Sequence, residues 1–157
     1  MLKLISRTRD FIWNKFVRWL TYEKENDVIP LSDFDRMRYE LRPGDVLLVE
    51  GRSKVSDIIK MITQSIWTHS ALYIGRLQDI DDPELRLHIQ KFYPDCADDL
   101  MIIESLLGQG TIVTSLDKYK SEHVRICRPK GLTRPDAQEV IRYTIRQLGT
   151  DYNVRQL

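Results

Sequence analysis

Apolar and polar residues follow two different periodicities along this chain. Between residues 68 and 74 they alternate, which places His69, Ala71 and Tyr73 on one face of a predicted strand and the residues between them on the other. Residues 53–62 instead carry apolar side chains every three to four positions, which is typical of a helix. We expect five strands, at residues 45–50, 68–74, 101–106, 111–115 and 123–127.

Turn and cap residues separate these elements. Arg42, Pro43 and Gly44 form a turn before the first strand, and Thr133 is placed to cap a last helix that Gly149 ends. The helices are expected at residues 2–25, 53–62, 82–92 and 135–148, with Ser32 as the cap of a short helix that reaches Met37. Strands joined by short links, with helices at both ends, indicate an α+β fold with a mainly antiparallel sheet of about five strands and flanking helices. The acidic stretch 76–100 is interpreted as an insertion between strands rather than part of the core.

The first residues form a segment of their own. Residues 2–25 predict an amphipathic helix, and the first twenty residues hold five basic side chains and one acidic one. One interpretation is an interfacial helix that touches anionic lipid; the other is a helix that docks on the domain or on a partner. We therefore divide the chain into this helix at 1–26 and a domain at 27–157. The apolar stripe consists of Ile5, Ile12, Phe16, Trp19 and Leu20.

Net charge, cysteine content and the lengths of apolar runs argue against several classes of function. The formal net charge of the 157 residues is +1, which gives no support for nucleic-acid binding. Two cysteines without a pairing motif do not indicate a disulfide scaffold, so a reducing, cytoplasmic compartment is the expectation, with peripheral membrane contact through residues 2–20 left open. The sequence has no apolar run of about 18 residues and no convincing signal peptide.

Two residues are candidates for catalysis. His69 begins a predicted strand after a polar loop, where an imidazole can serve as a general base, although a lone histidine is also common as a structural residue. Glu104 shares a face with apolar Ile102 and Leu106, so its carboxylate needs a partner if it is buried. If the two strands pair, Glu104 can orient the imidazole of His69; otherwise it is an edge-strand acid in solvent.

A nucleophile is harder to find. Cys96 lies among Asp95, Asp98 and Asp99, which disfavour a thiolate. Cys127 ends a strand, where an inert thiol is expected. Ser70 points away from His69 in a regular strand.

The sequence also gives little support for a metal or a cofactor. His123 and Cys127 lie about 13 Å apart on a strand, too far to share one zinc ion. His88 has no ligand-type neighbour on its helix, and no phosphate-binding glycine loop is present. We expect neither metal nor cofactor.

Four segments in order resemble a known family. They are LRPGDVLLVEG, a serine-rich helix start, WTHSALYIG and MIIESLLGQGTIVTSLDKY. This combination resembles the circularly permuted branch of the NlpC-like, papain-fold cysteine hydrolases, and most closely the YiiX-like group, with lecithin:retinol acyltransferase as a more distant relative. The resemblance extends over about residues 41–152.

The resemblance implies roles for matching residues. His69 corresponds to the catalytic base, Glu104 to the residue that orients it, and Gly44 with Asp45 to the opening turn and strand. In the family, the nucleophilic cysteine begins a helix that follows a segment like residues 149–153. The chain stops at Leu157, so we expect the nucleophile downstream of it and the domain to be incomplete at that end.

Two functions follow as hypotheses. The first is a thiol hydrolase that cleaves an amide or ester bond of a cell-wall peptide or a lipid. The second is a non-catalytic papain-like module that binds a ligand or associates with a membrane. The missing thiol favours the second, and the resemblance favours the first.

Overall fold

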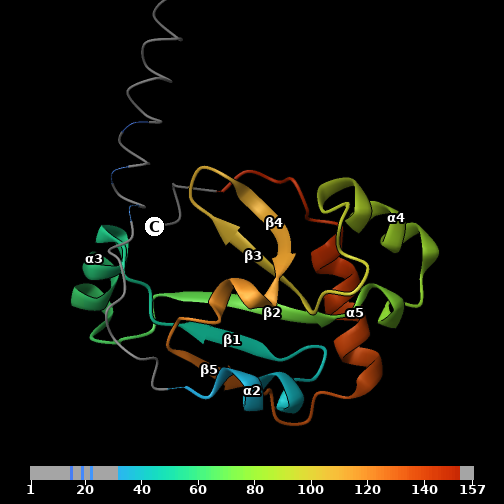
Figure 1. The fold of residues 1–157 in the computed structure, drawn as a ribbon, viewed down its shortest axis with the longest axis horizontal. Coiled ribbons are helices and arrows are strands. Elements are labelled where there is room, and N and C mark those ends of the chain that lie inside the picture. The colour runs from blue at the N-terminus through green and yellow to red at the C-terminus, as the bar shows by residue number, and fades with distance from the viewer. Residues whose placement is uncertain (1–14, 16–18, 20–21, 23–31, 153–157) are drawn as a thin grey trace, which may run out of the picture.

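The structure is a computed structural model, and it describes residues 15, 19, 22 and 32–152 (Figure 1). Most of the predicted helix 2–25 therefore lies outside the described residues. Among the residues that are described, none of the helices is both long and apolar enough to cross a membrane.

Among the described residues, one five-stranded sheet forms the centre of the domain. Every neighbouring pair of strands in it is antiparallel. The strands lie in the order β4 (Gly110–Ser115), β3 (Met101–Leu106), β2 (His69–Gly75), β1 (Val46–Val49) and β5 (Val124–Cys127). The predicted α+β class and the antiparallel sheet are confirmed, with strand ends within one residue of the expected positions.

In the described part of the chain, four helices and two short 3-10 turns surround this sheet (Figure 1). The helices are α2 (Phe34–Glu40), α3 (Lys54–Thr63), α4 (Pro83–Phe92) and α5 (Arg134–Ile145). The 3-10 turns are η1 (Leu77–Asp79) and η2 (Leu116–Tyr119).

Side-chain caps fix where the helices begin. Thr133 accepts a hydrogen bond from the backbone N–H of Asp136, as predicted for the start of α5. The prediction for α2 is wrong by one residue, because Asp33 rather than Ser32 caps this helix. The Ser32 hydroxyl instead donates to the Glu122 carbonyl and accepts from the Val124 N–H, so it joins the chain before α2 to β5.

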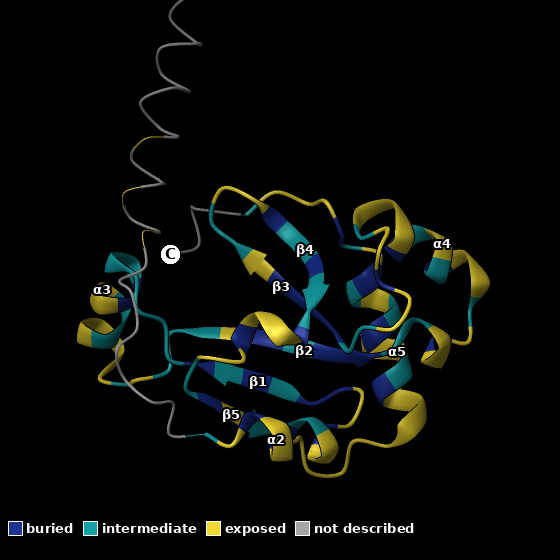
Figure 2. Cartoon of the chain, in the orientation of Figure 1, coloured by how far each residue is buried: buried dark blue, intermediate teal, exposed yellow. Residues whose placement is uncertain are grey.

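The two faces of the sheet carry separate apolar cores. Figure 2 shows in dark blue the buried residues along the strands and helices. The alternation in β2 divides between them as predicted: Ala71 and Tyr73 belong to one core and Ile74 to the other. The first core also contains residues of α2 and η2, and the second contains residues of α4 and α5. Each face of β2 is therefore buried under different elements.

The interpretation of residues 76–100 as an insertion is wrong. Ile80, Leu85, Ile89 and Cys96 are all buried in the second core. Leu85 and Ile89 lie four residues apart and so project from the same face of α4 toward the sheet. The stretch is rich in acidic residues, but it also carries an apolar stripe. This stripe completes the second core.

Candidate active site

β2 begins at His69, and its strand pairing determines which way the imidazole points. His69 lies opposite Val49 of β1, and Val49 lies opposite Val124 of β5. Since directly paired residues project to the same side, His69 shares a face with Val49 and with the buried residues Ala71 and Tyr73. The imidazole therefore stands on the face of the first core, at one end of the sheet.

The neighbouring strand β3 brings Glu104 to this imidazole. Leu72 pairs with Ile103, so the next pair along places Glu104 opposite Ala71, two residues from His69 and on the same face. His69 Nε2 lies 2.6 Å from Glu104 Oε2. The predicted approach of His69 and Glu104 is thus present, and the alternative of a solvent-facing Glu104 is wrong, because its side chain is fully buried.

Two residues of η2 complete the surroundings of the Glu104 carboxylate. The Tyr119 hydroxyl donates to Oε2 at 2.5 Å, and Lys118 Nζ donates to Oε1 at 2.6 Å. The Ser115 hydroxyl accepts from the Asp117 N–H and so starts this 3-10 turn directly after β4. Each carboxylate oxygen therefore has a donor supplied by the chain that follows β4, and Oε2 also bonds to His69.

These contacts determine the charge of Glu104. Burial raises the pKa of the carboxyl, but the hydrogen bonds from His69, Lys118 and Tyr119 outweigh it and lower the pKa to about 2. Glu104 is therefore ionised at neutral pH and can only accept hydrogen bonds.

The ionised carboxylate sets the tautomer of His69. Nε2 carries the proton that it donates to Glu104, so in the neutral imidazole the lone pair lies on Nδ1. Nδ1 has no hydrogen-bond partner in the described part of the chain. The imidazole is held through one nitrogen and offers the other as a base.

The two cysteines lie away from His69. Cys96 is buried in the second core, on the other face of the sheet, where burial raises the pKa of its thiol and Asp99 and Asp95 add to that effect. Cys127 lies opposite Val46, three residues along β1 from the row that contains His69. Ser70 is exposed on the opposite face. Among the described residues, no thiol stands beside Nδ1.

The chain that follows α5 returns to the His69 end of the sheet. Gly149 donates its N–H to the Thr111 carbonyl, and the Thr111 N–H donates to the Thr150 carbonyl, both at 2.9 Å. Gly110 permits this approach: its φ is +75°, and a Cβ at this position would lie 2.3 Å from the Thr150 carbonyl oxygen. Gly110 pairs with Leu106, so Thr150 stands at the same end of the sheet as His69.

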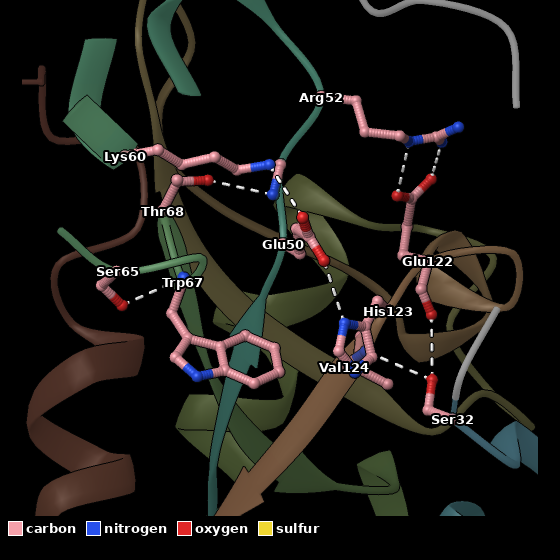
Figure 3. A network of polar contacts seen from close by, with 11 residues as sticks. Ser32, Glu50, Arg52, Lys60, Ser65, Trp67, Thr68, Glu122, His123 and Val124 are labelled. Atoms are coloured by element: carbon pink, nitrogen blue, oxygen red, sulfur yellow. Dashed lines mark hydrogen bonds and ion pairs between the residues drawn. The ribbon is translucent and has the colours of Figure 1, made fainter. Parts of the chain in front are cut away.

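A second histidine–glutamate pair, formed by His123 and Glu50, lies at this end of the sheet (Figure 3). Glu50 follows β1 and His123 precedes β5, and the Glu50 N–H donates to the His123 carbonyl. The pleat directs their side chains away from the face of His69. His123 Nδ1 lies 2.9 Å from Glu50 Oε2, and Lys60 Nζ donates to the other Glu50 oxygen at 2.9 Å. The ring of Trp67 packs against His123 at 5.0 Å between centroids.

The sequence alone does not indicate this second pair. Its spacing suggests His123 only as a metal partner of Cys127, and no motif marks Glu50 or Trp67 as functional. The missing information is the strand order, because only the adjacency of β1 and β5 brings the end of one beside the start of the other. Within the described residues, no group of three or more histidine, cysteine, aspartate or glutamate side chains could hold a metal ion.

A groove of about 720 Å³ lies at the other end of β1. Its wall includes Asp45, which is buried and bonded by Arg128 through both Nε and Nη2 at 2.8 and 2.7 Å. Asp45 also accepts from the Arg42 N–H, so the pair fixes the turn before β1. Neither His69 nor Glu104 lines this groove, and its arginines and aspartates are balanced, so we place the candidate chemistry at the His69 end.

Comparison with known proteins places the chain in a family. A family model described as "Permuted papain-like amidase enzyme, YaeF/YiiX, C92 family" matches residues 40–156. Searches of the curated proteins and of the solved structures found no match. The matched region covers most of the chain and includes both His69 and Glu104. The chain therefore belongs to the YaeF/YiiX, C92 family of permuted papain-like amidases.

Proposed function

We propose that the protein is a cysteine amidase or esterase in which His69 is the general base and Glu104 orients it. The observation that carries the proposal is the hydrogen bond of 2.6 Å between His69 Nε2 and a fully buried Glu104 carboxylate. Such a carboxylate holds the imidazole in one tautomer and stabilises the imidazolium that forms during turnover.

The proposed reaction proceeds in two steps. Nδ1 of His69 takes the proton of a cysteine thiol, and the thiolate adds to the carbonyl carbon of the substrate. The bond from this carbon to the amine or alcohol then breaks, the leaving group takes the proton from His69, and a thioester remains. Water attacks the thioester with its proton passing to Nδ1, and the thiol is regenerated as the acid leaves.

The nucleophile in this proposal comes from the natural chain downstream of Leu157. Neither Cys96 nor Cys127 lies beside His69, as described above. The backbone of Thr150 already stands at the His69 end of the sheet, next to Thr111. A helix that followed within a few residues would have a short path to Nδ1.

Two substrate classes remain within the proposal. A cell-wall peptide and a lipid both contain bonds that this chemistry can break, an amide in the first and an ester or amide in the second. A non-catalytic binding module is the alternative function, and the absence of a thiol near His69 in the described chain favours it.

The test is to isolate the protein from its natural source, measure its intact mass and label it with a thiol-directed activity probe. The proposal predicts a mass above 18.6 kDa and rapid labelling of a cysteine beyond Leu157, which His69→Ala slows. A mass equal to that of this chain, or labelling only at Cys96 or Cys127, would contradict the proposal and support the binding module.

A further inference from the structure

The buried carboxylate of Glu104 needs a positively charged partner. Its side chain has no exposed surface, and it is ionised at neutral pH. A buried negative charge is costly unless a cation compensates it. In the described part of the chain, three side chains bond to this carboxylate, those of His69, Lys118 and Tyr119. The hydroxyl of Tyr119 is neutral, so among these three only Lys118 and a protonated His69 can supply the positive charge.

The fold holds Lys118 against this carboxylate from the solvent side. The lysine side chain is 38% exposed, and its Nζ lies 2.6 Å from Glu104 Oε1 and 5.2 Å from the centroid of the Tyr119 ring. The lysine and the tyrosine are consecutive residues of η2, and this turn is anchored by Leu116, which has no exposed surface. The turn and the ion pair together therefore fix the position of the ammonium.

Other charges near the pair have partners elsewhere. Asp117 precedes Lys118 in η2, but it pairs with Arg38 of α2 at 3.3 Å. Lys60 of α3 bonds to Glu50, whose side chain points away from the face of His69. Within the described residues, Lys118 is thus the one permanent cation that contacts the histidine–glutamate pair on this face.

The net charge of the site then depends on Lys118. With the lysine present, an ionised Glu104 and a neutral His69 give a net charge of zero, and protonation of His69 adds an uncompensated positive charge. Without the lysine, the same two groups carry a net negative charge, and protonation of His69 is what makes the site neutral. Because nearby charges act strongly in a buried site, the lysine lowers the pH at which the imidazole becomes charged.

We propose that Lys118 acts through Glu104 as a positioning residue: as the permanent counter-ion of the carboxylate, it leaves His69 neutral and free to take a proton. An imidazole that already carries two protons cannot accept the proton of a thiol. Glu104 can thus orient the ring without also keeping a proton on Nδ1. The proposal rests on the proposed function for its catalytic meaning, but the charge of His69 can be measured without a nucleophile or a substrate.

NMR titration of the ¹⁵N-labelled 157-residue chain tests the proposal. Lys118→Met removes the charge and keeps a long side chain, and it should raise the pH at which half of His69 is protonated by about one unit or more. Lys118→Arg keeps the charge and should restore the wild-type midpoint. The matched control is Lys120→Met, because Lys120 is exposed and no contact in the described part of the chain joins it to Glu104. This control should titrate close to the wild type.

A double variant tests whether the effect depends on the charge of the site. Lys118→Met combined with Glu104→Gln again gives a net charge of zero with a neutral His69, so its midpoint should return toward that of the wild type. This variant also contains no unpaired buried carboxylate, so it keeps the test open if Lys118→Met alone does not fold. Three results would overturn the proposal: an unchanged midpoint in Lys118→Met, an equal rise in Lys120→Met, or a midpoint of the double variant far from that of the wild type.

The pH profile of the natural protein connects this charge effect to catalysis. In Lys118→Met, the acid limb of kcat/KM should move to higher pH by the same amount as the NMR midpoint, and Lys118→Arg should restore it. A purely structural role of the lysine would lower the rate without moving this limb. A moved NMR midpoint with an unmoved limb would contradict His69 as the base, and hence the proposed function, whereas an unmoved midpoint would contradict the role of Lys118 itself.

Discussion

Two histidine–glutamate pairs stand at the same end of the sheet, and they differ in how the protein encloses them. The His69–Glu104 pair has a carboxylate with no exposed surface and three donors, whereas the Glu50 side chain of the other pair is 30% exposed and bonds to His123 and Lys60. The pairs also use opposite ring nitrogens: Nε2 of His69 and Nδ1 of His123 meet the carboxylates.

This difference in burial determines whether the carboxylate can hold its histidine in one orientation. A buried carboxylate must remain bonded to its partners, because the cost of leaving it unpaired is high, and so it holds the imidazole in one orientation. A carboxylate open to water can exchange its partners for solvent at little cost. The enclosed pair is therefore the better candidate for catalysis, although both consist of the same residue types.

Replacing each histidine in the natural protein should produce the largest contrast. We expect His69→Ala to lower amide or ester hydrolysis about 10²- to 10⁴-fold, because the general base is removed. His123→Ala is the matched variant, and we expect it to change hydrolysis less than about tenfold, since the second pair is not assigned a proton transfer. The measurement is kcat with a substrate that the wild-type protein hydrolyses. Loss of activity in His123→Ala with little effect of His69→Ala would reverse the assignment of the two pairs.

Replacing the glutamate of each pair should lower the free energy of unfolding by different amounts. The pKa of Glu104 falls from its ordinary value of 4.5 to about 2, which corresponds to about 3 kcal/mol of stabilisation by the ionised form. This stabilisation is fully present above about pH 4.5 and is lost as the pH falls through about 2. Glu104→Gln should thus lower the free energy of unfolding by about 3 kcal/mol at pH 7 and progressively less in acid.

Glu50→Gln is the comparison for that experiment. Hydrogen bonds from His123 and Lys60 lower the pKa of Glu50, but its exposure limits the effect to less than about 1 kcal/mol at pH 7. Urea unfolding of the wild type and both variants between pH 7 and pH 3 measures these terms. Two results would contradict this prediction. One is an equal loss in the free energy of unfolding for Glu104→Gln and Glu50→Gln, and the other is a loss for Glu104→Gln that does not become smaller in acid.

A smaller effect is expected from Tyr119→Phe. The change removes one hydrogen bond to Glu104 Oε2 and keeps the buried ring, so we expect a loss of about 1 kcal/mol in the free energy of unfolding. The pKa of Glu104 should rise for the same reason, which weakens the acid dependence. Tyr143→Phe on α5 is the control, since Tyr143 is 66% exposed, and it should leave the unfolding curve in place. Equal curves for both variants would remove Tyr119 from the site.

The sequence predicts the parts of this molecule that depend on local patterns. The alternation around Ala71 and Tyr73 predicts the face of His69, and an acid among apolar residues at Glu104 predicts a partnered carboxylate. The third and fourth strands and the start of α5 follow from runs and caps of the same kind.

The rest depends on contacts between distant segments. Lys118 and Tyr119 reach Glu104 because η2 folds back over the sheet after β4, and no pattern in residues 116–120 indicates this. Glu50 meets His123, which lies 73 residues further along the chain, only because β1 and β5 are neighbours in the sheet. The prediction of an insertion at residues 76–100 is wrong because the charged residues of this stretch outnumber the few apolar residues that complete the core.

The tautomers of the two histidines test the central claim most directly. Ring-nitrogen shifts of ¹⁵N-labelled protein, recorded by two-bond ¹H–¹⁵N NMR above pH 8 and assigned with His69→Ala and His123→Ala, report which nitrogen carries the proton. The structure predicts a proton on Nε2 of His69, leaving Nδ1 as the base, and a proton on Nδ1 of His123. A proton on Nδ1 of His69 would contradict the account, because the nitrogen assigned to take the thiol proton would already carry one.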